Sequence, residues 1–273
     1  MLVLKRLQSL DEYMGFVHEI SCDPCFRDPM LSTDEQVRCN LLDAPKKPLN
    51  QIFGVFEEGT VIGLFVFLIL EDEKYMEMLV GLSKHQTAYG EMVSFLKQNF
   101  PGYHSDFVYN PNNFLLTSVL RDTGATFEKE QQKMVWKNEI IYQSPHQVEL
   151  YSNKYKEQYF AIHSRDGYWT ADKVIEAPDR FRVLLAIKDG EVVGYTDVTY
   201  TYRENEPFDI FVKQEHRKRG YAKAMMAKAL ELNRPNAMML LMDIDHTAAI
   251  ALYESLGFVK VHGENSVVAH ILL

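Results

Sequence analysis

The sequence predicts an α+β protein made of two similar domains, each with a mixed, mostly antiparallel sheet flanked by helices. Two observations support this prediction. Ile52–Val66 and Val183–Asp197 have the same pattern, an apolar strand, a glycine-containing tight turn and a second apolar strand. Each of these hairpins is then followed by a strand, a helix, a second helix closed by glycine, and a final strand. Ordered agreement of this kind indicates a duplication.

The hairpins are predicted from their turns. Asp189-Gly190 is a strong hairpin signal because both residues tolerate positive φ. The first hairpin turns at Glu57–Thr60, and Gly59 and Gly63 are spaced as Gly190 and Gly194 are.

The elements downstream of the first hairpin follow from hydrophobic period and glycine position. Tyr75–Leu82 indicates a strand and Gln86–Asn99 a helix. Asn113–Leu120 indicates an amphipathic helix that Gly124 closes. Upstream, the proline breaks within Leu10–Leu49 predict helices and loops.

The second copy repeats these elements. Phe208–Val212 indicates a strand, Tyr221–Leu232 a helix, and His246–Tyr253 a helix closed by Gly257. Gln147–Arg180 matches the helical start of the first copy. The boundary is expected near Tyr142–Gln147, which predicts domains 1–142 and 143–273.

Composition limits the class of protein. The 273 residues carry a net charge of −9, with 47% hydrophobic and 25% charged residues, which is typical of a globular protein. The longest apolar run, Val61–Leu70, is too short to cross a bilayer. The N-terminus lacks the pattern of a signal peptide, so we expect a cytoplasmic protein with neither membrane nor nucleic-acid partners.

The three cysteines do not predict a disulfide framework. Cys22 and Cys25 have C-x-x-C spacing with His18 nearby, and Cys39 could add a ligand. A second C-x-x-C pair and a preceding strand are both missing from the sequence. We therefore expect incidental thiols and no metal site.

The most informative stretch is a basic turn between a strand and a helix. A glycine lets the backbone approach an anion closely, and the first N–H groups of a helix then point at it. In an acidic protein such a turn predicts a specific phosphorylated ligand. The residues are Arg217, Lys218, Arg219, Gly220, Tyr221 and Ala222.

The second half resembles the GNAT superfamily of acyl-CoA-dependent N-acyltransferases over about Phe181–Leu273. Arg217-x-x-Gly220-x-Ala222 is similar to the loop by which that family binds the pyrophosphate of coenzyme A. The stretch His246–Phe258 is similar to its N-x-x-A-x-x-L-Y-x-x-x-G-F motif, with histidine in place of asparagine. Phe208–Val212 matches the strand that pairs with the pantetheine arm.

The resemblance implies acetyl-CoA as cosubstrate and transfer of a short acyl group to a primary amine. It places Val212 or its neighbour as the backbone donor to the thioester carbonyl, Tyr253 as the acid for the thiolate, and His246 near the cofactor. Core packing of Tyr253 is the structural alternative. For the base, Glu206 has the family spacing, Asp209 is the other candidate, and ordered water alone is a third possibility.

The first half keeps the fold pattern without these groups. Its loop Leu82–Gly90 has a single basic residue, Lys84, and Leu120 stands at the tyrosine position. We therefore expect one active site, in the second half, beside a degenerate copy. A CoA-binding pseudoenzyme or sensor is the alternative. The acceptor, a small amine or a peptide, and the oligomeric state are not predicted.

Overall fold

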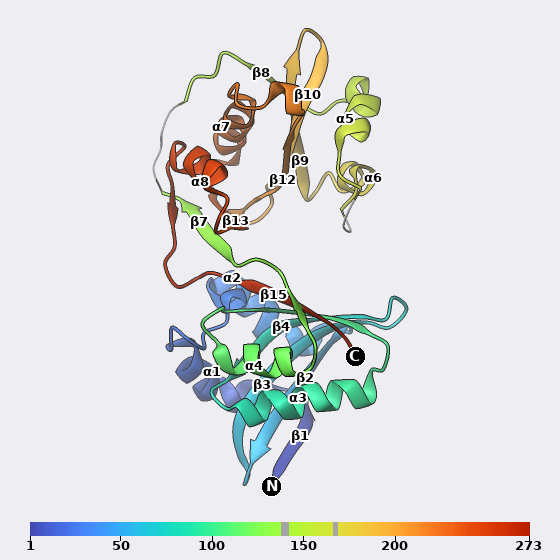
Figure 1. Cartoon of the computed structure of the whole chain (residues 1–273), viewed down its shortest axis with the longest axis vertical. Helices are drawn as coiled ribbons and strands as arrows, with labels where there is room; N and C mark the ends of the chain where they lie inside the picture. The colour runs from blue at the N-terminus through green and yellow to red at the C-terminus, as the bar shows by residue number, and fades with distance from the viewer. Residues whose placement is uncertain (138–141, 166–168) are drawn as a thin grey trace. The chain divides into compact units, whose positions relative to one another are not determined.

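The chain forms two compact units in the computed structural model, which describes residues 1–137, 142–165 and 169–273 (Figure 1). The first unit consists of Met1–Gln132 together with His262–Leu273, and the second of Lys133–Val261. Both units combine a sheet with helices, so the predicted α+β class is confirmed.

The first unit has a seven-stranded sheet in the order β1-β2-β3-β4-β5-β15-β6. Neighbouring strands are antiparallel except β4 and β5, which are parallel. The strands are β1 (Leu2–Leu7), β2 (Asn50–Glu57), β3 (Thr60–Leu70), β4 (Tyr75–Ser83), β5 (His104–Tyr109), β6 (Thr126–Phe127) and β15 (Val267–Leu272).

Helices cover both faces of this sheet. On one face α3 (Gln86–Asn99) and α4 (Phe114–Asp122) bury a large apolar cluster that includes Phe65, Tyr89 and Leu120 (Figure 1). A second cluster covers the other face with residues from the N-terminal helices and turns. Those are α1 (Met14–Ser21), α2 (Asp34–Gln36), the π-helical segment Val37–Leu42, and the 3-10 turns Asp11–Tyr13, Pro29–Leu31 and Ala44–Lys46.

The second unit divides its strands between two four-stranded sheets, with the orders β12-β10-β9-β8 and β11-β13-β7-β14. In the described chain β12 is therefore an end strand that does not pair with β13. The strands are β7 (Gln131–Trp136), β8 (Gln147–Leu150), β9 (Phe181–Lys188), β10 (Glu191–Thr199), β11 (Glu204–Asn205), β12 (Pro207–Val212), β13 (Ala237–Asp243) and β14 (Phe258–Lys260).

In the described part of this unit, four helices and two 3-10 turns accompany the sheets. One apolar cluster, with Tyr159, Val174 and Leu185, joins α5 (Lys156–Ile162) and α6 (Ala171–Glu176) to one face of the first sheet. Clusters on the opposite face contain residues of α7 (Tyr221–Asn233) and α8 (Thr247–Glu254). The 3-10 turns are Asn153–Tyr155 and Gln214–His216.

The last strand of each half lies in the sheet of the other unit. Strand β15 from the end of the chain lies between β5 and β6, whereas β7 lies between β13 and β14. The register pairs Val267 with Tyr109 and Phe258 with Trp136. This exchange moves the division of the chain from the expected residue 142 to residue 132, and it assigns residues 262–273 to the first unit.

The repeated hairpins are confirmed with their turns. Glu58 and Gly59 have φ of 50° and 86°, and Asp189 and Gly190 have 51° and 84°. Paired positive φ values match the twist of the strands they join. Of the predicted helices, Gln86–Asn99 has the bounds expected from the sequence.

No helix of the described chain is long and apolar enough to span a membrane. The cysteines Cys22, Cys25 and Cys39 are free thiols.

Candidate active site

The basic turn is shaped as an anion site. Lys218 and Gly220 have positive φ, 59° and 90°, and Gly220 is the N-cap of α7. The first helical bond runs from Ala224 N–H to the Gly220 carbonyl. Among the described residues, the backbone N–H groups from Lys218 to Lys223 have no hydrogen-bond acceptor. A helix start with free donors in this number is suited to a phosphate group.

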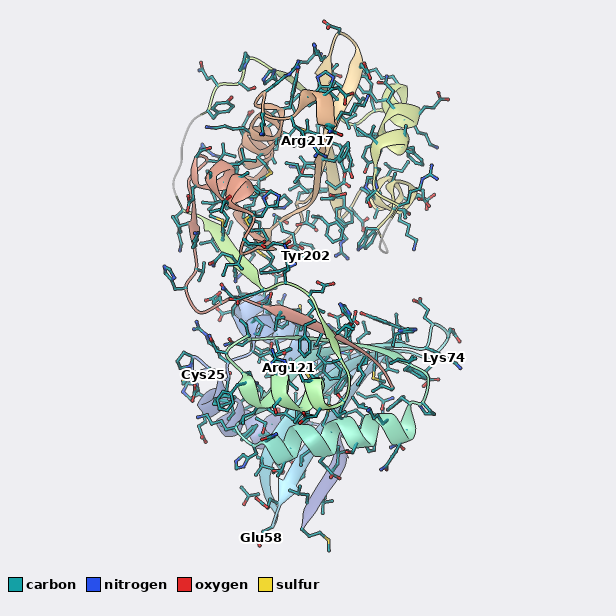
Figure 2. The ribbon with its side chains drawn as sticks, viewed as in Figure 1. Cys25, Glu58, Lys74, Arg121, Tyr202 and Arg217 are labelled. Carbon is teal, nitrogen blue, oxygen red and sulfur yellow. The ribbon has the colours of Figure 1, made fainter. Side chains whose placement is uncertain are left out.

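The side chains of the turn divide their roles. Lys218 and Arg219 are exposed, and no acidic partner for them is found in the described part of the chain. Arg217, between the end of β12 and α7 (Figure 2), donates from Nε to the Val212 carbonyl at 3.0 Å. Its guanidinium lies 5.8 Å from the centre of the Phe211 ring. Arg217 thus fixes the loop to the strand, and its neighbours supply the free charges.

His146, which was not predicted from the sequence, contacts both the backbone of the turn and the first residue of α7. Its Nε2 lies 2.7 Å from the Arg219 carbonyl, and because a carbonyl only accepts, Nε2 carries the proton. The imidazole also packs on the Tyr221 ring, with centroids 4.1 Å apart. A Cβ at Gly220 would approach His146 Nε2 to 3.3 Å, so the glycine also makes room for this contact.

Strand β12 presents backbone donors at its unpaired edge. Lys213 N–H donates to the Val193 carbonyl, toward β10. Because N–H groups alternate along a strand, those of Ile210 and Val212 point away from β10. Gly194, opposite Val212, allows the close pairing: a Cβ there would lie 2.6 Å from the Phe211 carbonyl oxygen.

Tyr253 lies on α8, and its ring is in the same apolar cluster as Ile210. The residue is 6% exposed, and burial raises the pKa of Tyr253 to about 12. Its ring also packs edge to face on Phe258 at 5.6 Å. Its hydroxyl makes no hydrogen bond to any residue that the structure describes. The phenol is therefore packed as a core aromatic, yet it keeps a free donor.

The two candidate bases lie in different surroundings. Glu206 precedes β12, and burial raises its pKa, with Glu204 adding to the shift and Arg180 opposing it. Its backbone is bound to Thr199 on β10. Asp209 lies within β12 and accepts a hydrogen bond from the Tyr195 hydroxyl at 2.6 Å. Of these two carboxylates, Asp209 alone accepts a hydrogen bond from a side chain within the described residues.

His246 caps α8, because its Nδ1 accepts from Ala249 N–H at 3.2 Å. Asn113 caps α4 in the first unit in the same way, through Leu116 N–H. The imidazole of His246 therefore has its proton on Nε2, and this nitrogen has no partner among the described residues.

The first unit fills the corresponding strand edge with its own side chain. Gly63 pairs with Ser83 as Gly194 pairs with Val212, so Gly81 in β4 corresponds to Ile210 in β12. Gly81 N–H donates to the carboxyl of Asp28 at 2.7 Å, and Met30 N–H donates to its other oxygen at 2.8 Å.

Asp28 is nearly inaccessible to solvent, and burial raises its pKa to about 7 against the effect of these two donors. The corresponding donor, which lies at an unpaired strand edge in the described part of the second unit, is thus already used in the first.

Comparison with known proteins supports the resemblance seen in the sequence. Residues 179–260 match the family model described as the acetyltransferase (GNAT) domain, which confirms the resemblance seen in the sequence. A search of the curated proteins found no match to this chain.

Solved structures with the same fold span both units. A tandem GNAT protein from the clavulanic acid biosynthesis pathway is 13% identical, with a TM-score of 0.61 over 99% of this chain and 98% of that one. A GCN5-related N-acetyltransferase from Sphaerobacter thermophilus is 12% identical, with a TM-score of 0.66 over 99% and 95%. At these identities the likeness concerns the fold.

Proposed function

We propose that the second unit transfers an acetyl or other short acyl group from acyl-CoA to a primary amine. The observation that carries this proposal is the row of N–H groups from Lys218 to Lys223, which have no acceptor among the described residues, together with the edge of β12 that no described strand pairs with. Acetyl-CoA would supply an activated thioester, and its pyrophosphate is the anion that such a turn fits. The cytoplasmic location stays a prediction.

Each residue of the site then has a chemical task. The N–H groups of the turn, with Lys218 and Arg219, hold the pyrophosphate. The N–H of Ile210 or Val212 donates to the thioester carbonyl and stabilises the negative charge that develops on its oxygen. The Nε2–H of His246 is available to the cofactor.

Tyr253 acts on the departing sulfur. Because its pKa is raised to about 12, the phenol stays protonated at neutral pH. A thiol is more acidic, with a pKa of about 8.5. Tyr253 therefore donates a hydrogen bond to the thiolate. Full transfer of its proton to the sulfur requires that the phenol oxygen takes up another proton, such as one from the acceptor nitrogen.

Acetyl-CoA binding and turnover test the proposal separately. Saturating acetyl-CoA should raise the melting temperature of the wild-type protein, since a ligand that binds the folded state stabilises it. Tyr253→Phe should keep this shift but lower the rate of CoA release in a thiol assay with a panel of amines, by roughly 10- to 100-fold.

Three outcomes decide between the readings. A wild-type protein that acetyl-CoA does not stabilise would refute the proposal. Binding without CoA release for any amine would favour a sensor or pseudoenzyme. Unchanged turnover in Tyr253→Phe would show that the hydroxyl has no catalytic role and that Tyr253 serves only to pack the core.

A further inference from the structure

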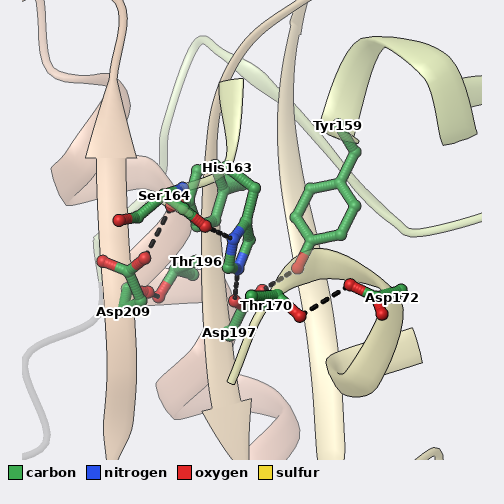
Figure 3. Close-up of polar contacts among 9 residues, drawn as sticks. Tyr159, His163, Ser164, Thr170, Asp172, Thr196, Asp197 and Asp209 are labelled. Carbon is green, nitrogen blue, oxygen red and sulfur yellow. Dashed lines mark hydrogen bonds and ion pairs between the residues drawn. The ribbon is translucent and has the colours of Figure 1, made fainter. Parts of the chain in front are cut away.

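A group of polar side chains lies buried between the first sheet of the second unit and helix α5 (Figure 3). His163 follows α5 and Asp197 lies on β10, with side chains 2% and 0% exposed and with Nε2 and Oδ2 2.8 Å apart. The other carboxylate oxygen of Asp197 accepts from the Tyr159 hydroxyl at 2.8 Å. All of these groups face α5 and α6, opposite α7.

The His163–Asp197 pair is electrically neutral overall. The Ser164 carbonyl lies 2.7 Å from His163 Nδ1 and can only accept, so Nδ1 carries a proton. One more proton lies between Nε2 and Asp197, giving either imidazolium with carboxylate or two neutral groups. Burial lowers the pKa of His163, but the hydrogen bonds to Asp197 and Ser164 outweigh it and the pKa is raised.

Asp209 is the third acidic or basic side chain of the group, beside His163 and Asp197. The Tyr195 hydroxyl donates to its Oδ2 at 2.6 Å, and Ser164 N–H donates to the Tyr195 oxygen at 3.2 Å. Ligand atoms of His163, Asp197 and Asp209 all lie within 4.8 Å of one another. Within the described residues, the second carboxylate oxygen of Asp209 accepts no hydrogen bond, and the residue is partly exposed.

The same strand carries Asp209 and the donors for the thioester. Asp209 and Phe211 alternate with Ile210 and Val212, so their side chains lie on the α5 side of β12. Phe211 lies against Tyr195 at 5.9 Å and against the Arg217 guanidinium. An open carboxylate oxygen and an aromatic ring thus flank the strand edge on the side away from α7.

We propose that Asp209 binds the ammonium group of the acceptor and takes its proton, and that Tyr195 and the His163–Asp197 pair position Asp209. The acceptor is then an amine that is cationic at neutral pH, with one positive charge at its reacting end. This inference rests on the proposed acyltransferase function. It assigns the base to Asp209 in place of Glu206, which has no side-chain donor to hold it in the described chain.

The proton and bond changes balance. An N–H bond of the ammonium group breaks as the O–H bond of Asp209 forms, which frees the nitrogen lone pair. That nitrogen then forms the C–N bond to the acyl carbon as the C–S bond breaks. The second proton leaves the nitrogen for the thiolate sulfur, and Asp209 returns its proton to solvent.

Benzylamine and benzyl alcohol form a matched pair of probes, because they differ in charge and both offer a ring to Phe211. With saturating CoA, benzylamine should raise the melting temperature of the wild-type protein above a control of equal ionic strength, whereas benzyl alcohol should not. Asp209→Asn should abolish this shift. The same variant should lower kcat/KM for benzylamine by at least about 100-fold while the Kd for acetyl-CoA stays within about twofold.

Two further variants separate positioning from folding. Glu204→Gln, which removes the carboxylate that neighbours Glu206, should leave both readouts unchanged. Tyr195→Phe removes the hydroxyl that holds Asp209. It should lower kcat/KM for benzylamine about 10-fold, mainly through KM, while the Kd for acetyl-CoA stays within about twofold. Because this difference between amine and cofactor is read from active protein, it tests the proposal even if Asp209→Asn fails to fold.

Specific results would overturn the inference. Full activity in Asp209→Asn with a loss in Glu206→Gln would return the base to Glu206. Acetyl-CoA binding without any effect of benzylamine would refute the ammonium site while leaving the cofactor site standing. A stoichiometric divalent metal that Asp209→Asn removes would make the group a metal site. Failure of acetyl-CoA itself to bind would instead refute the proposed function.

Discussion

In the second unit the N–H of Ile210 points to the unpaired edge of β12, whereas in the first unit the N–H of Gly81 donates to Asp28. The fold places both groups at the same position. The helix starts also differ. Gly220 precedes α7, where N–H groups without an acceptor in the described chain lie beside basic side chains, but α3 follows a loop with a single lysine, Lys84. One copy of the fold is thus open to an anion and a carbonyl, and the other is closed by its own residues.

The strand exchange is the feature whose loss should have the largest effect. A fragment of residues 133–261 keeps every strand of the second unit except the first two residues of β7. A fragment of residues 143–273 lacks β7, whose Met134 is fully buried, and carries β15 without its neighbours. The first fragment should unfold cooperatively on heating, followed by far-UV circular dichroism, and the second should show no such transition.

A cooperative transition in residues 143–273 would contradict the exchange. A shared failure of both fragments would show that the units fold only together.

Gly220→Asp should abolish the binding of acetyl-CoA to the basic turn of the second unit. A side chain at φ of 90° is strained, it approaches His146, and its carboxylate repels the phosphates. We expect the affinity to fall more than about 100-fold, or about 3 kcal/mol. Isothermal titration calorimetry measures this directly.

Gly90→Asp is the matched control, since Gly90 lies in α3 of the first unit with open space around it. Binding that weakens equally in both variants would argue against a site in the second unit alone.

Asp28→Asn should change how stability depends on pH. Because the pKa of Asp28 is about 7 in the folded protein and about 4 in the unfolded chain, the folded state holds this proton more tightly. The group therefore stabilises the protein fully below pH 4, and this stabilisation is lost as pH rises to about 7.

Urea unfolding across this range should show a decline for the wild type, on the order of a few kcal/mol, that the asparagine variant lacks. If the free energy of unfolding depended on pH in the same way for both proteins, Asp28 would not be a buried carboxyl that is protonated in the folded state.

His146→Phe should have the smallest effect. The ring can still pack on Tyr221, but the hydrogen bond to the Arg219 carbonyl is lost. A neutral hydrogen bond contributes about 1 kcal/mol, so the Kd for acetyl-CoA should rise about fivefold. An unchanged Kd would show that the turn keeps its shape without His146.

The sequence predicted what depends on local pattern. The paired hairpins, the glycine-led helix α7 and the two helix starts at Asn113 and His246 follow from turn chemistry and hydrophobic period. The exchange of β7 and β15 could not be predicted this way, because an apolar strand can pair equally well with strands of its own half or of the other half. The hydrophobic pattern predicts that a strand forms but does not identify the strand it pairs with.

The site shows the same limit. The residues of the turn were found because they are contiguous, from Arg217 to Ala222. His146 and Asp28 were missed because each acts on a backbone group distant in sequence, Arg219 and Gly81 respectively. An isolated histidine or aspartate in a loop gives no signal of such a contact. The proline after Asp28, which starts a short 3-10 turn, is a cue to local structure and not to its partner.

The number of acetyl-CoA molecules bound per chain tests the central claim most directly. Isothermal titration calorimetry of the full chain should give one site, and Gly220→Asp should leave none. Two sites in the wild type would contradict the closure of the first unit by Asp28, and one site remaining in Gly220→Asp would place the cofactor outside the turn.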